Sequence, residues 1–544
     1  IAECVALALD AIHGLADPLP GQIRRDLGLL DLEAAFRAVH LPRNRAEHEE
    51  GLRRLLFDEA FATQAAMAYR RADVSRQTAI ARPGQKDGLV AAFDARLPFT
   101  LTEQQRAVGE ELAADLASVR PMRRLLQGEV GSGKTIVALR AMLQVVESGG
   151  QAVLLAPTEV LAQQHARTIA GLLGELGQGQ LVGGAAATEV ALLTGSGPAA
   201  VRNDSRRRIA SGQAGLVVGT HALLAESVEF ADLGLVVIDE QHRFGVEQRN
   251  ALTGRQRSHP HVLVMTATPI PRSVAMTVFG DLDLITLSDL PRGRAAVTTV
   301  TVDYAAKPAW AERVWQRVRE EAEAGRQAYV VTPRIDPVED GVWFGSAVEA
   351  FERLSTGPLA GLRLGLLHGR LPAAEKDSVM SEFAAGRLDI LVATSMVEVG
   401  LDVANATAMV IGEAERFGIS QLHQLRGRIG RGSQPGVCLL LTGAPEGSAA
   451  RGRLEFVAKN NDGFALAEAD LAQRREGDVL GASQSGSKSS LRLLRVLEHA
   501  ELIKQAREAA KRVVAKDPEL SDPGVADYVR EIELLAETGF DEVA

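Results

Sequence analysis

The chain has 544 residues, 46% hydrophobic and 24% charged, which is enough for large buried cores and a length typical of roughly three or four domains. Its 70 acidic residues outnumber 60 Lys and Arg, for a formal net charge of −10. This balance excludes a wholly basic nucleic-acid-binding surface but not a local basic groove. Cys4 and Cys438 are too few and too far apart for a disulfide scaffold or a structural zinc site.

No apolar run reaches the ~18–20 residues that span a bilayer, and the N-terminus lacks the basic segment and cleavage site of a secretory signal. We therefore expect a reducing, cytoplasmic setting. Because the chain begins with Ile1 rather than Met, we also expect it to be a fragment or a trimmed product.

The first 95 residues have a helical pattern. Residues 1–15 and 32–39 predict short helices joined by a turn at 18–21, and residues 52–71 predict a longer helix without internal Gly or Pro. No catalytic signature occurs here. We interpret this lead-in as a brace for the next domain, with a linker at residues 83–88.

Residues 97–108 open a further helix, which Thr102 can cap. Gln105 lies on its first turn. A glutamine there is usually a solvated side chain, but its position upstream of a phosphate-binding motif favours contact with an adenine edge.

That motif is GEVGSGKT at residues 128–135, which matches G-x-x-x-x-G-K-[ST]. The leucines before it indicate a buried strand, and residues 136–146 have helical apolar spacing. An ordinary glycine-rich turn is the alternative, but this flanking pattern favours a nucleoside triphosphate site. Glycines let the backbone approach phosphates at the positive helix end, where Lys134 can neutralise the β- and γ-phosphates and Thr135 can bind Mg²⁺. The predicted loop contacts are Gly128, Gly131, Ser132, Gly133, Lys134 and Thr135.

Short apolar runs then alternate with helical patterns, as in parallel sheets buried on both faces. Strands of a first lobe are predicted at residues 152–156, 190–193, 216–218, 235–238 and 262–265. A hinge is expected at 291–294. A second lobe without a phosphate loop follows, with strands predicted at 298–302, 328–332, 362–367, 390–393, 408–411 and 437–441, and helices at 309–323 and 374–385. From residue 454 the chain has a mainly helical and charged pattern.

Asp239 and Glu240 follow an apolar strand, at the end where open α/β sheets bind ligands. An isolated acidic pair there would usually cap a helix. With a phosphate loop upstream, we assign Asp239 to Mg²⁺ and Glu240 to polarising the attacking water. Thr266 and Thr268 follow the next strand and suit a relay between nucleotide states, although a plain turn is the alternative.

Gln424, Arg428 and Arg431 are spaced by four and three residues, which predicts one helical face. Arginines from a second lobe can stabilise charge on the γ-phosphate, as arginine fingers do. The alternative is an ordinary basic helix face that is exposed to solvent. The neighbouring Gly427 and Gly430 argue against it, because glycine costs about 1 kcal/mol inside a helix.

Eight segments occur in the order of the superfamily 2 helicase motifs: GEVGSGKT, APTEVLAQQH, VGTHAL, DEQHRFG, TATPIPR, LLHGR, ATSMVEVGLDV and QLHQLRGRIGRG. Their variants resemble RecG, a family of bacterial ATP-dependent helicases acting on branched DNA. Residues 460–486 also resemble the translocation motif that this family shares with the transcription-repair coupling factor.

The resemblance implies roles for individual residues. It supports Gln105 at adenine and the assignments above for Lys134, Asp239 and Glu240. It also supports the arginine-finger role of Arg428 and Arg431, and it adds Gly400 and Asp402 near the nucleotide. DNA contact or coupling of hydrolysis to movement is implied for Pro157, Thr158, Gly219, Thr220, His368, Gly369, Thr394, Ser395, Arg474 and Gln484, and coupling is expected for Thr266, Thr268 and Gln424. Many of these are small residues, suited to phosphate contacts that carry no sequence information.

The sequence departs from the family pattern at three positions. Arg475 and Glu476 stand where Gly-Pro is usual, and Ser483 replaces an Arg. Since Arg474 and Gln484 are kept, we expect coupling to survive. The family's N-terminal wedge, an OB-like domain, has no counterpart in these 544 residues, and the helical lead-in resembles the part that follows it.

We therefore expect an α/β protein with two RecA-like doubly wound parallel-sheet lobes, a helical N-terminal lead-in and a mainly helical C-terminal segment. The expected boundaries are residues 1–95, 96–290, 291–450 and 451–544. The expected function is ATP- and Mg²⁺-dependent translocation on double-stranded DNA at stalled forks and Holliday junctions, with 3′-to-5′ polarity implied by the resemblance. The expected partners are branched DNA and single-stranded DNA-binding protein, for a monomer associated with the nucleoid.

Three alternatives remain at this point. A transcription-repair coupling translocase shares the translocation motif but needs an RNA-polymerase-binding domain. An RNA helicase lacks a counterpart of residues 460–486. A nucleotide-gated DNA-binding scaffold without turnover is disfavoured by Glu240, Arg428 and Arg431.

Overall fold

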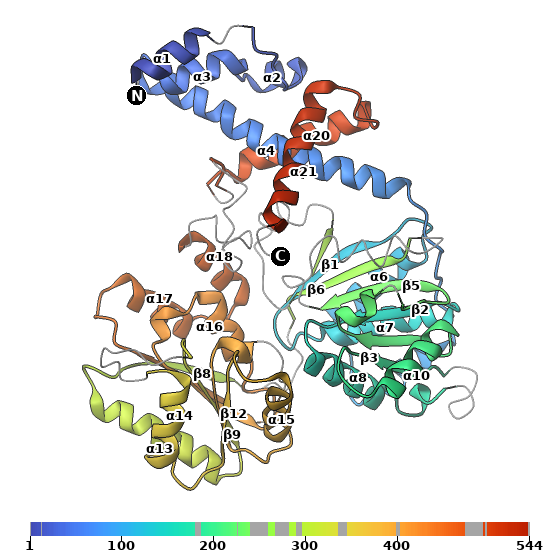
Figure 1. Cartoon of the computed structure of the whole chain (residues 1–544), viewed down its shortest axis with the longest axis vertical. Coiled ribbons are helices and arrows are strands. Elements are labelled where there is room, and N and C mark those ends of the chain that lie inside the picture. Colours follow the sequence, from blue (N-terminus) through green and yellow to red (C-terminus); the bar gives the residue numbers. More distant parts are fainter. Residues whose placement is uncertain are drawn as a thin grey trace. The chain divides into compact units, whose positions relative to one another are not determined.

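The computed structural model describes residues 2–11, 14–179, 187–225, 227–239, 259–266, 282–289, 296–335, 345–398, 403–432, 434–473, 493–495 and 498–541 (Figure 1). It divides into two compact units. One comprises the described residues within 1–78, 270–284 and 471–544, and the other those within 79–269 and 285–470. The second unit contains two parallel sheets.

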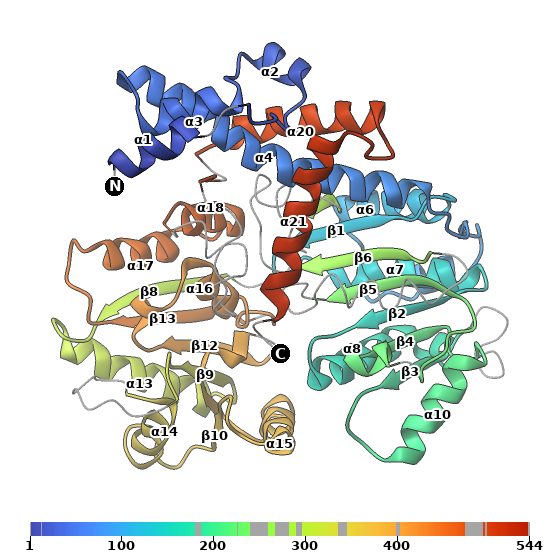
Figure 2. The ribbon, with the colours of Figure 1, turned by 45° about the horizontal axis from the view of Figure 1, so that its top comes forward.

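The first sheet has the strand order β3-β4-β2-β5-β6-β1-β7. Its strands are β1 (Arg123–Gly128), β2 (Gln151–Leu155), β3 (Val190–Leu193), β4 (Leu216–Gly219), β5 (Leu233–Asp239), β6 (His261–Thr266) and β7 (Asp283–Leu287). The helices of this region are α5 (Leu89–Asp94), α6 (Glu103–Leu116), α7 (Lys134–Glu147), α8 (Glu159–Leu173) and α10 (Ala199–Ala210), with 3₁₀ turns η1 (Gly174–Gly177) and η2 (His221–Leu224). Figure 2 shows β1, β6, β5 and β2 side by side.

The second sheet has the order β10-β11-β9-β12-β13-β8, and its paired strands are all parallel. Its strands are β8 (Val297–Asp303), β9 (Gln327–Val331), β10 (Leu364–Leu367), β11 (Ile390–Ala393), β12 (Ala406–Ile411) and β13 (Gly436–Thr442). The helices here are α13 (Pro308–Glu323), α14 (Ala347–Thr356), α15 (Ala373–Ala384), α16 (Ile419–Arg426), α17 (Ala449–Lys459) and α18 (Gly463–Gln473), with η4 (Ser395–Glu398) and η5 (Ala414–Arg416).

Both faces of the second sheet are buried, which explains the continuous apolar runs in its sequence. Side chains alternate between faces along a strand, and on β9 Tyr329 and Val331 enter one hydrophobic cluster while Ala328 and Val330 enter another. Cys438 lies in the first of these clusters, and its burial raises the pKa of the thiol to about 12. The predicted doubly wound fold is confirmed.

The other unit is helical. It contains α1 (Ala2–Ala11), α2 (Gly21–Leu27), α3 (Leu32–His40), α4 (Arg45–Arg76), α20 (Ala500–Lys516) and α21 (Pro523–Asp541). The long helix α4 packs against α20 and α21 across more than 400 residues of sequence (Figure 2). The predicted N-terminal helices are confirmed, while α2 begins where only a turn was expected.

A buried ionic cluster joins these helices. Arg54 is fully buried and donates to both oxygens of Asp17 at 2.8 and 3.0 Å and to Asp58 Oδ1 at 3.1 Å. The Tyr528 hydroxyl of α21 donates to the same Asp58 oxygen at 2.8 Å. Burial raises the pKa of Asp58 to about 6 despite the nearby Arg54 guanidinium.

Among the described helices none is long and apolar enough to cross a bilayer.

Candidate nucleotide site

The phosphate loop connects β1 to α7, as the sequence predicts. Gly131 and Gly133 have φ angles of 85° and 87°, a left-handed conformation that only glycine adopts readily. Gly133 directly precedes α7, so the loop backbone lies at the positive end of that helix. Lys134 Nζ donates to the carbonyls of Gly128 and Glu129 at 2.8 and 2.9 Å, which keeps its ammonium group over the loop.

The interior of the loop has no room for added side chains. A Cβ on Gly128 would lie 2.6 Å from Ser132 Oγ and 2.8 Å from the Leu287 carbonyl. The Ser132 hydroxyl is buried, and no described residue gives it a hydrogen-bond partner. A glycine cradle with a buried hydroxyl, an ammonium group and the Thr135 hydroxyl beside it fits a triphosphate with its Mg²⁺.

Gln105 links helix α6 to this loop. Thr102 and Gln105 form a capping box, in which Thr102 Oγ1 accepts from Gln105 N at 3.1 Å and Gln105 Oε1 accepts from Thr102 N at 3.0 Å. Gln105 Nε2 also donates to the Ser132 carbonyl at 2.8 Å. The Gln105 side chain is therefore buried against the phosphate loop and is not exposed to solvent, as a glutamine on the first turn of a helix usually is.

Two further predicted residues lie at the same edge of the sheet. In the parallel register Gln127 of β1 pairs with Thr266 of β6, and Asp239 of β5 pairs with Met265. Because parallel strands end together, Asp239 and Thr266 lie at the carboxyl edge from which the phosphate loop begins. This is the edge where an open α/β sheet binds ligands.

The Asp239 carboxylate has a partner that sequence reasoning did not identify. His165 Nε2 of α8 lies 2.7 Å from Asp239 Oδ2, and the two side chains are only 13% and 15% exposed. Burial raises the pKa of Asp239, but the His165 hydrogen bond and the charges of His165, Lys134 and Arg428 outweigh it, so that the pKa lies below its ordinary value. The carboxylate is ionised, and His165 Nε2 therefore donates to it.

The prediction that one helical face presents Gln424, Arg428 and Arg431 is wrong. Gln424 lies on α16, but that helix ends at Arg426; Arg428 lies in the turn that follows it, and Arg431 lies in the loop after that turn. Gly427 ends the helix against the phosphate loop, where an added Cβ would lie 3.2 Å from Val130 Cβ. Arg428 remains close enough to lower the pKa of Asp239, while Arg431 Nε donates to the Gly427 carbonyl at 3.0 Å.

The phosphate loop also contacts the start of the predicted translocation segment. Glu129 Oε1 accepts from the backbone nitrogen of Gly463 at 2.8 Å, at the N-terminus of α18. Farther along α18, Asp470 accepts from Ile419 N at 2.9 Å and from Ser420 Oγ at 2.7 Å. Thus α18 is hydrogen-bonded both to the loop and to the first turn of α16.

The predicted DNA-backbone contacts lie at the carboxyl ends of β2, β4, β10 and β11. They are Pro157 and Thr158, Gly219 and Thr220, His368 and Gly369, and Thr394 and Ser395. β2 neighbours β4 and β10 neighbours β11, so each sheet presents two pairs at one edge. Packing alone explains why residue 219 is a glycine, because an added Cβ would overlap the Leu193 carbonyl. At Gly369, by contrast, an added Cβ would make only ordinary van der Waals contacts.

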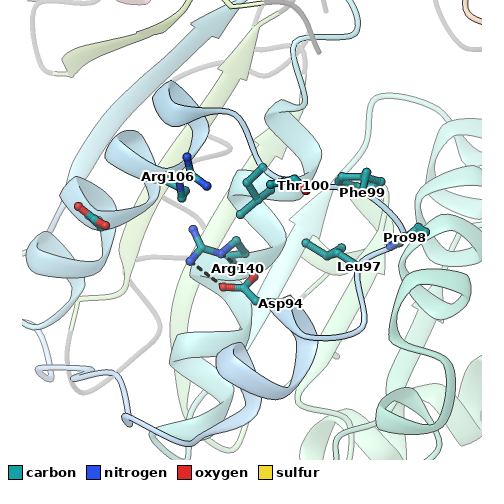
Figure 3. Close-up of a pocket in the computed structure, with 9 residues that line it drawn as sticks. Asp94, Leu97, Pro98, Phe99, Thr100, Arg106 and Arg140 are labelled. Carbon is teal, nitrogen blue, oxygen red and sulfur yellow. Dashed lines mark hydrogen bonds and ion pairs between the residues drawn. The ribbon is translucent and has the colours of Figure 1, made fainter. Parts of the chain in front are cut away.

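A hollow of about 490 Å³ opens beside the first turn of α6. Arg106 and Arg140 lie on one side of it, and Leu97 and Phe99 on the other (Figure 3). Arg140 makes a two-point hydrogen bond with Asp94, at 3.0 and 2.9 Å. Phe99 is 47% exposed. None of these side chains was predicted as functional.

Several predicted residues lie outside the described part of the chain. They are Glu240, Thr268, Gly400, Asp402, Arg474 and Gln484, together with the departures at Arg475, Glu476 and Ser483 and the hinge at residues 291–294. Their roles stay predictions.

Known families match most of the chain. The DEAD/DEAH box helicase family matches residues 102–277, the helicase conserved C-terminal domain matches residues 311–433, and the C-terminal part of domain 3 of the ATP-dependent DNA helicase RecG matches residues 460–541. The last match covers the segment in which the sequence resembles a translocation motif.

Whole-chain relatives agree with these families. The ATP-dependent DNA helicase RecG of Mycobacterium leprae is 52% identical over 97% of this chain and 72% of its own length. That of Bacillus subtilis is 40% identical over 94% of this chain and 72% of its own length. A solved structure of RecG bound to a three-way DNA junction is 38% identical, with a TM-score of 0.72 over 90% of this chain and 62% of that one. With the phosphate loop, the two parallel sheets and these matches in agreement, the chain belongs to the ATP-dependent DNA helicase RecG family.

Proposed function

We propose that this chain hydrolyses ATP with Mg²⁺ and uses the energy to move along double-stranded DNA at branch points such as stalled forks and Holliday junctions. The observation that carries the proposal is the meeting of the phosphate loop, Asp239 and Thr266 at one carboxyl sheet edge. The match to a RecG structure with a three-way junction supports branched DNA as the substrate.

In the proposed site, the loop backbone and Lys134 bind the β- and γ-phosphates. Thr135 and Asp239 would hold Mg²⁺, and the ion would neutralise the charge that develops on the phosphates. Glu240 orients the attacking water, and Arg428 and Arg431 stabilise the γ-phosphate charge.

The base of the nucleotide would lie beside the first turn of α6. There Gln105 faces the phosphate loop, and the neighbouring hollow offers the planar ring of Phe99 and the guanidinium of Arg106. An aromatic face and a planar cation are both suited to stacking on a base. Gly400 and Asp402 complete the proposed nucleotide contacts.

The DNA backbone would lie along the sheet edges that carry Thr158, Thr220, His368 and Thr394. Small polar residues and backbone amides bind phosphates without reading sequence, which suits an acidic translocase that acts on any branched DNA. Arg474 and Gln484 would couple hydrolysis to movement. The proposed assembly is a monomer at the nucleoid, with single-stranded DNA-binding protein as a further partner.

A phosphate-release assay with and without a synthetic fork tests this function, with strand separation of a labelled fork as a second measurement. We expect fork DNA to stimulate ATP hydrolysis, and Lys134→Ala and Glu240→Gln to abolish the stimulated rate. Lys86→Ala, an exposed lysine in the linker before α5, is the matched control and should behave like the wild type. DNA binding without any ATP turnover would instead establish the scaffold alternative.

A further inference from the structure

The contact between His165 and Asp239 joins two elements of the first sheet region. His165 lies on α8, which follows β2, and Asp239 ends the neighbouring strand β5. The Nε2–Oδ2 distance is 2.7 Å, and both side chains are largely shielded from solvent. A buried charge-assisted hydrogen bond of this length is among the stronger interactions in proteins.

The histidine ring is presented by a rigid helix. Thr158 caps α8, its side chain accepting from Leu161 N at 3.3 Å. Ala162 and Ile169, on either side of His165, are fully buried in the hydrophobic core of the sheet. The helix therefore fixes the backbone from which the His165 ring extends, and the hydrogen bond to that ring restrains the Asp239 carboxylate.

Hydrogen bonding distinguishes the two oxygens of the Asp239 carboxylate. Because His165 engages Oδ2, a metal ion or a metal-bound water would be held by Oδ1. Carboxylates that bind metals are commonly oriented by an outer hydrogen-bond donor, and loss of that donor typically lowers metal affinity or activity 10- to 100-fold. A buried histidine that merely satisfies a polar neighbour is the alternative interpretation.

We propose that His165 is a positioning residue for the metal site: it fixes Asp239 so that Oδ1 meets the Mg²⁺ of the bound nucleotide. This inference rests on the proposed ATP site. Because the proposed DNA contact Thr158 caps α8 and His165 lies two turns later, one helix would connect the DNA edge to the metal carboxylate.

The test is a Mg²⁺ titration of the binding of a fluorescent, non-hydrolysable ATP analogue to the whole chain. His165→Leu removes the donor while keeping bulk, and His165→Gln keeps an amide donor near the position of Nε2. Thr168→Leu is the control, on an exposed position of the same helix. Thermal unfolding shows whether each variant is folded, and if His165→Leu is not, His165→Asn takes its place, because its amide ends at the position of Nδ1.

We expect His165→Leu to raise the Mg²⁺ midpoint by about 10- to 100-fold while leaving the affinity for the metal-free analogue unchanged. His165→Gln should recover most of the wild-type midpoint, and Thr168→Leu should match the wild type. A wild-type midpoint in His165→Leu would overturn the inference, as would an equal loss of metal-free binding. If the wild-type chain shows no Mg²⁺-dependent nucleotide binding, the proposed ATP site itself is refuted.

Discussion

Replacing Gly133 by Ala tests how closely base recognition and phosphate binding are joined. Gly133 has a φ of 87°, and a Cβ at this position would overlap Gln105 Nε2. That amide donates to the Ser132 carbonyl at 2.8 Å and belongs to the capping box with Thr102. An alanine must therefore push the Gln105 amide nitrogen away from the Ser132 carbonyl, and this movement also weakens the capping box.

The same helix provides a matched control. Gly149, just beyond the C-terminal end of α7, has a φ of 88° but nothing within 4 Å of its Cβ position. Both substitutions incur the left-handed backbone cost of about 1–2 kcal/mol. Only Gly133→Ala also loses a buried hydrogen bond, about 1 kcal/mol, and part of a helix cap, about another 1 kcal/mol.

Gly133→Ala therefore costs about 2 kcal/mol more than Gly149→Ala. If this whole difference reduced the binding free energy of the nucleotide, affinity would fall about 30-fold. Binding of a fluorescent ATP analogue measures this directly. We expect the loss in Gly133→Ala and wild-type affinity in Gly149→Ala, with both showing lower thermal stability. In a Gln105→Ala background the additional effect of Gly133→Ala should largely disappear. Equal affinities of the two glycine variants would refute the steric reasoning.

Two further predictions concern charged groups. Arg428→Ala should lower ATP turnover by about 10³-fold, as loss of an arginine finger does, while nucleotide affinity stays near wild type, and a parallel loss of affinity would contradict the finger role. Burial raises the pKa of Asp58 to about 6, so folding takes up a proton, and the contribution of this carboxyl to stability is present at acid pH and lost as the pH rises through 6. Relative to Asp58→Asn, wild-type protection of α4 and α21 in hydrogen exchange should rise by about 1.4 kcal/mol between pH 7.5 and pH 5, and an unchanged difference would contradict this.

Much of the fold was predictable because its signals are local. Parallel strands buried on both faces have short apolar runs, and the predicted runs of both lobes coincide with strands. The helix start at Thr102 was predictable for the same reason, since a capping box lies within four residues. A similar signal was overlooked at Ser346 and Glu349, whose capping box opens α14. The strand β7 was not predicted, because its buried residues Ile285 and Leu287 alternate with more exposed ones and it has no continuous buried run.

The contacts of the site that were not predicted from the sequence join residues far apart in the chain. His165 and Asp239 are separated by 74 positions, and Glu129 and Gly463 by 334. No spacing rule links such pairs, and only the folded sheet brings them together. The end of α16 at Gly427 was misjudged for a related reason: its glycines were noticed, but the loop residue that packs against Gly427 could not be inferred from the helix alone.

Gln105 shows why the nucleotide site is best regarded as one unit. Its amide nitrogen holds the phosphate loop through Ser132, and its amide oxygen closes the capping box of α6. Each of these groups can make a second hydrogen bond, and the proposed adenine contact would use that remaining capacity. A base that pulled on this amide would therefore act directly on the loop that binds the phosphates. In the proposed site, selection of the base and the geometry at the γ-phosphate would then be coupled through a single side chain, so that a substitution at Gln105 or in the phosphate loop would change both.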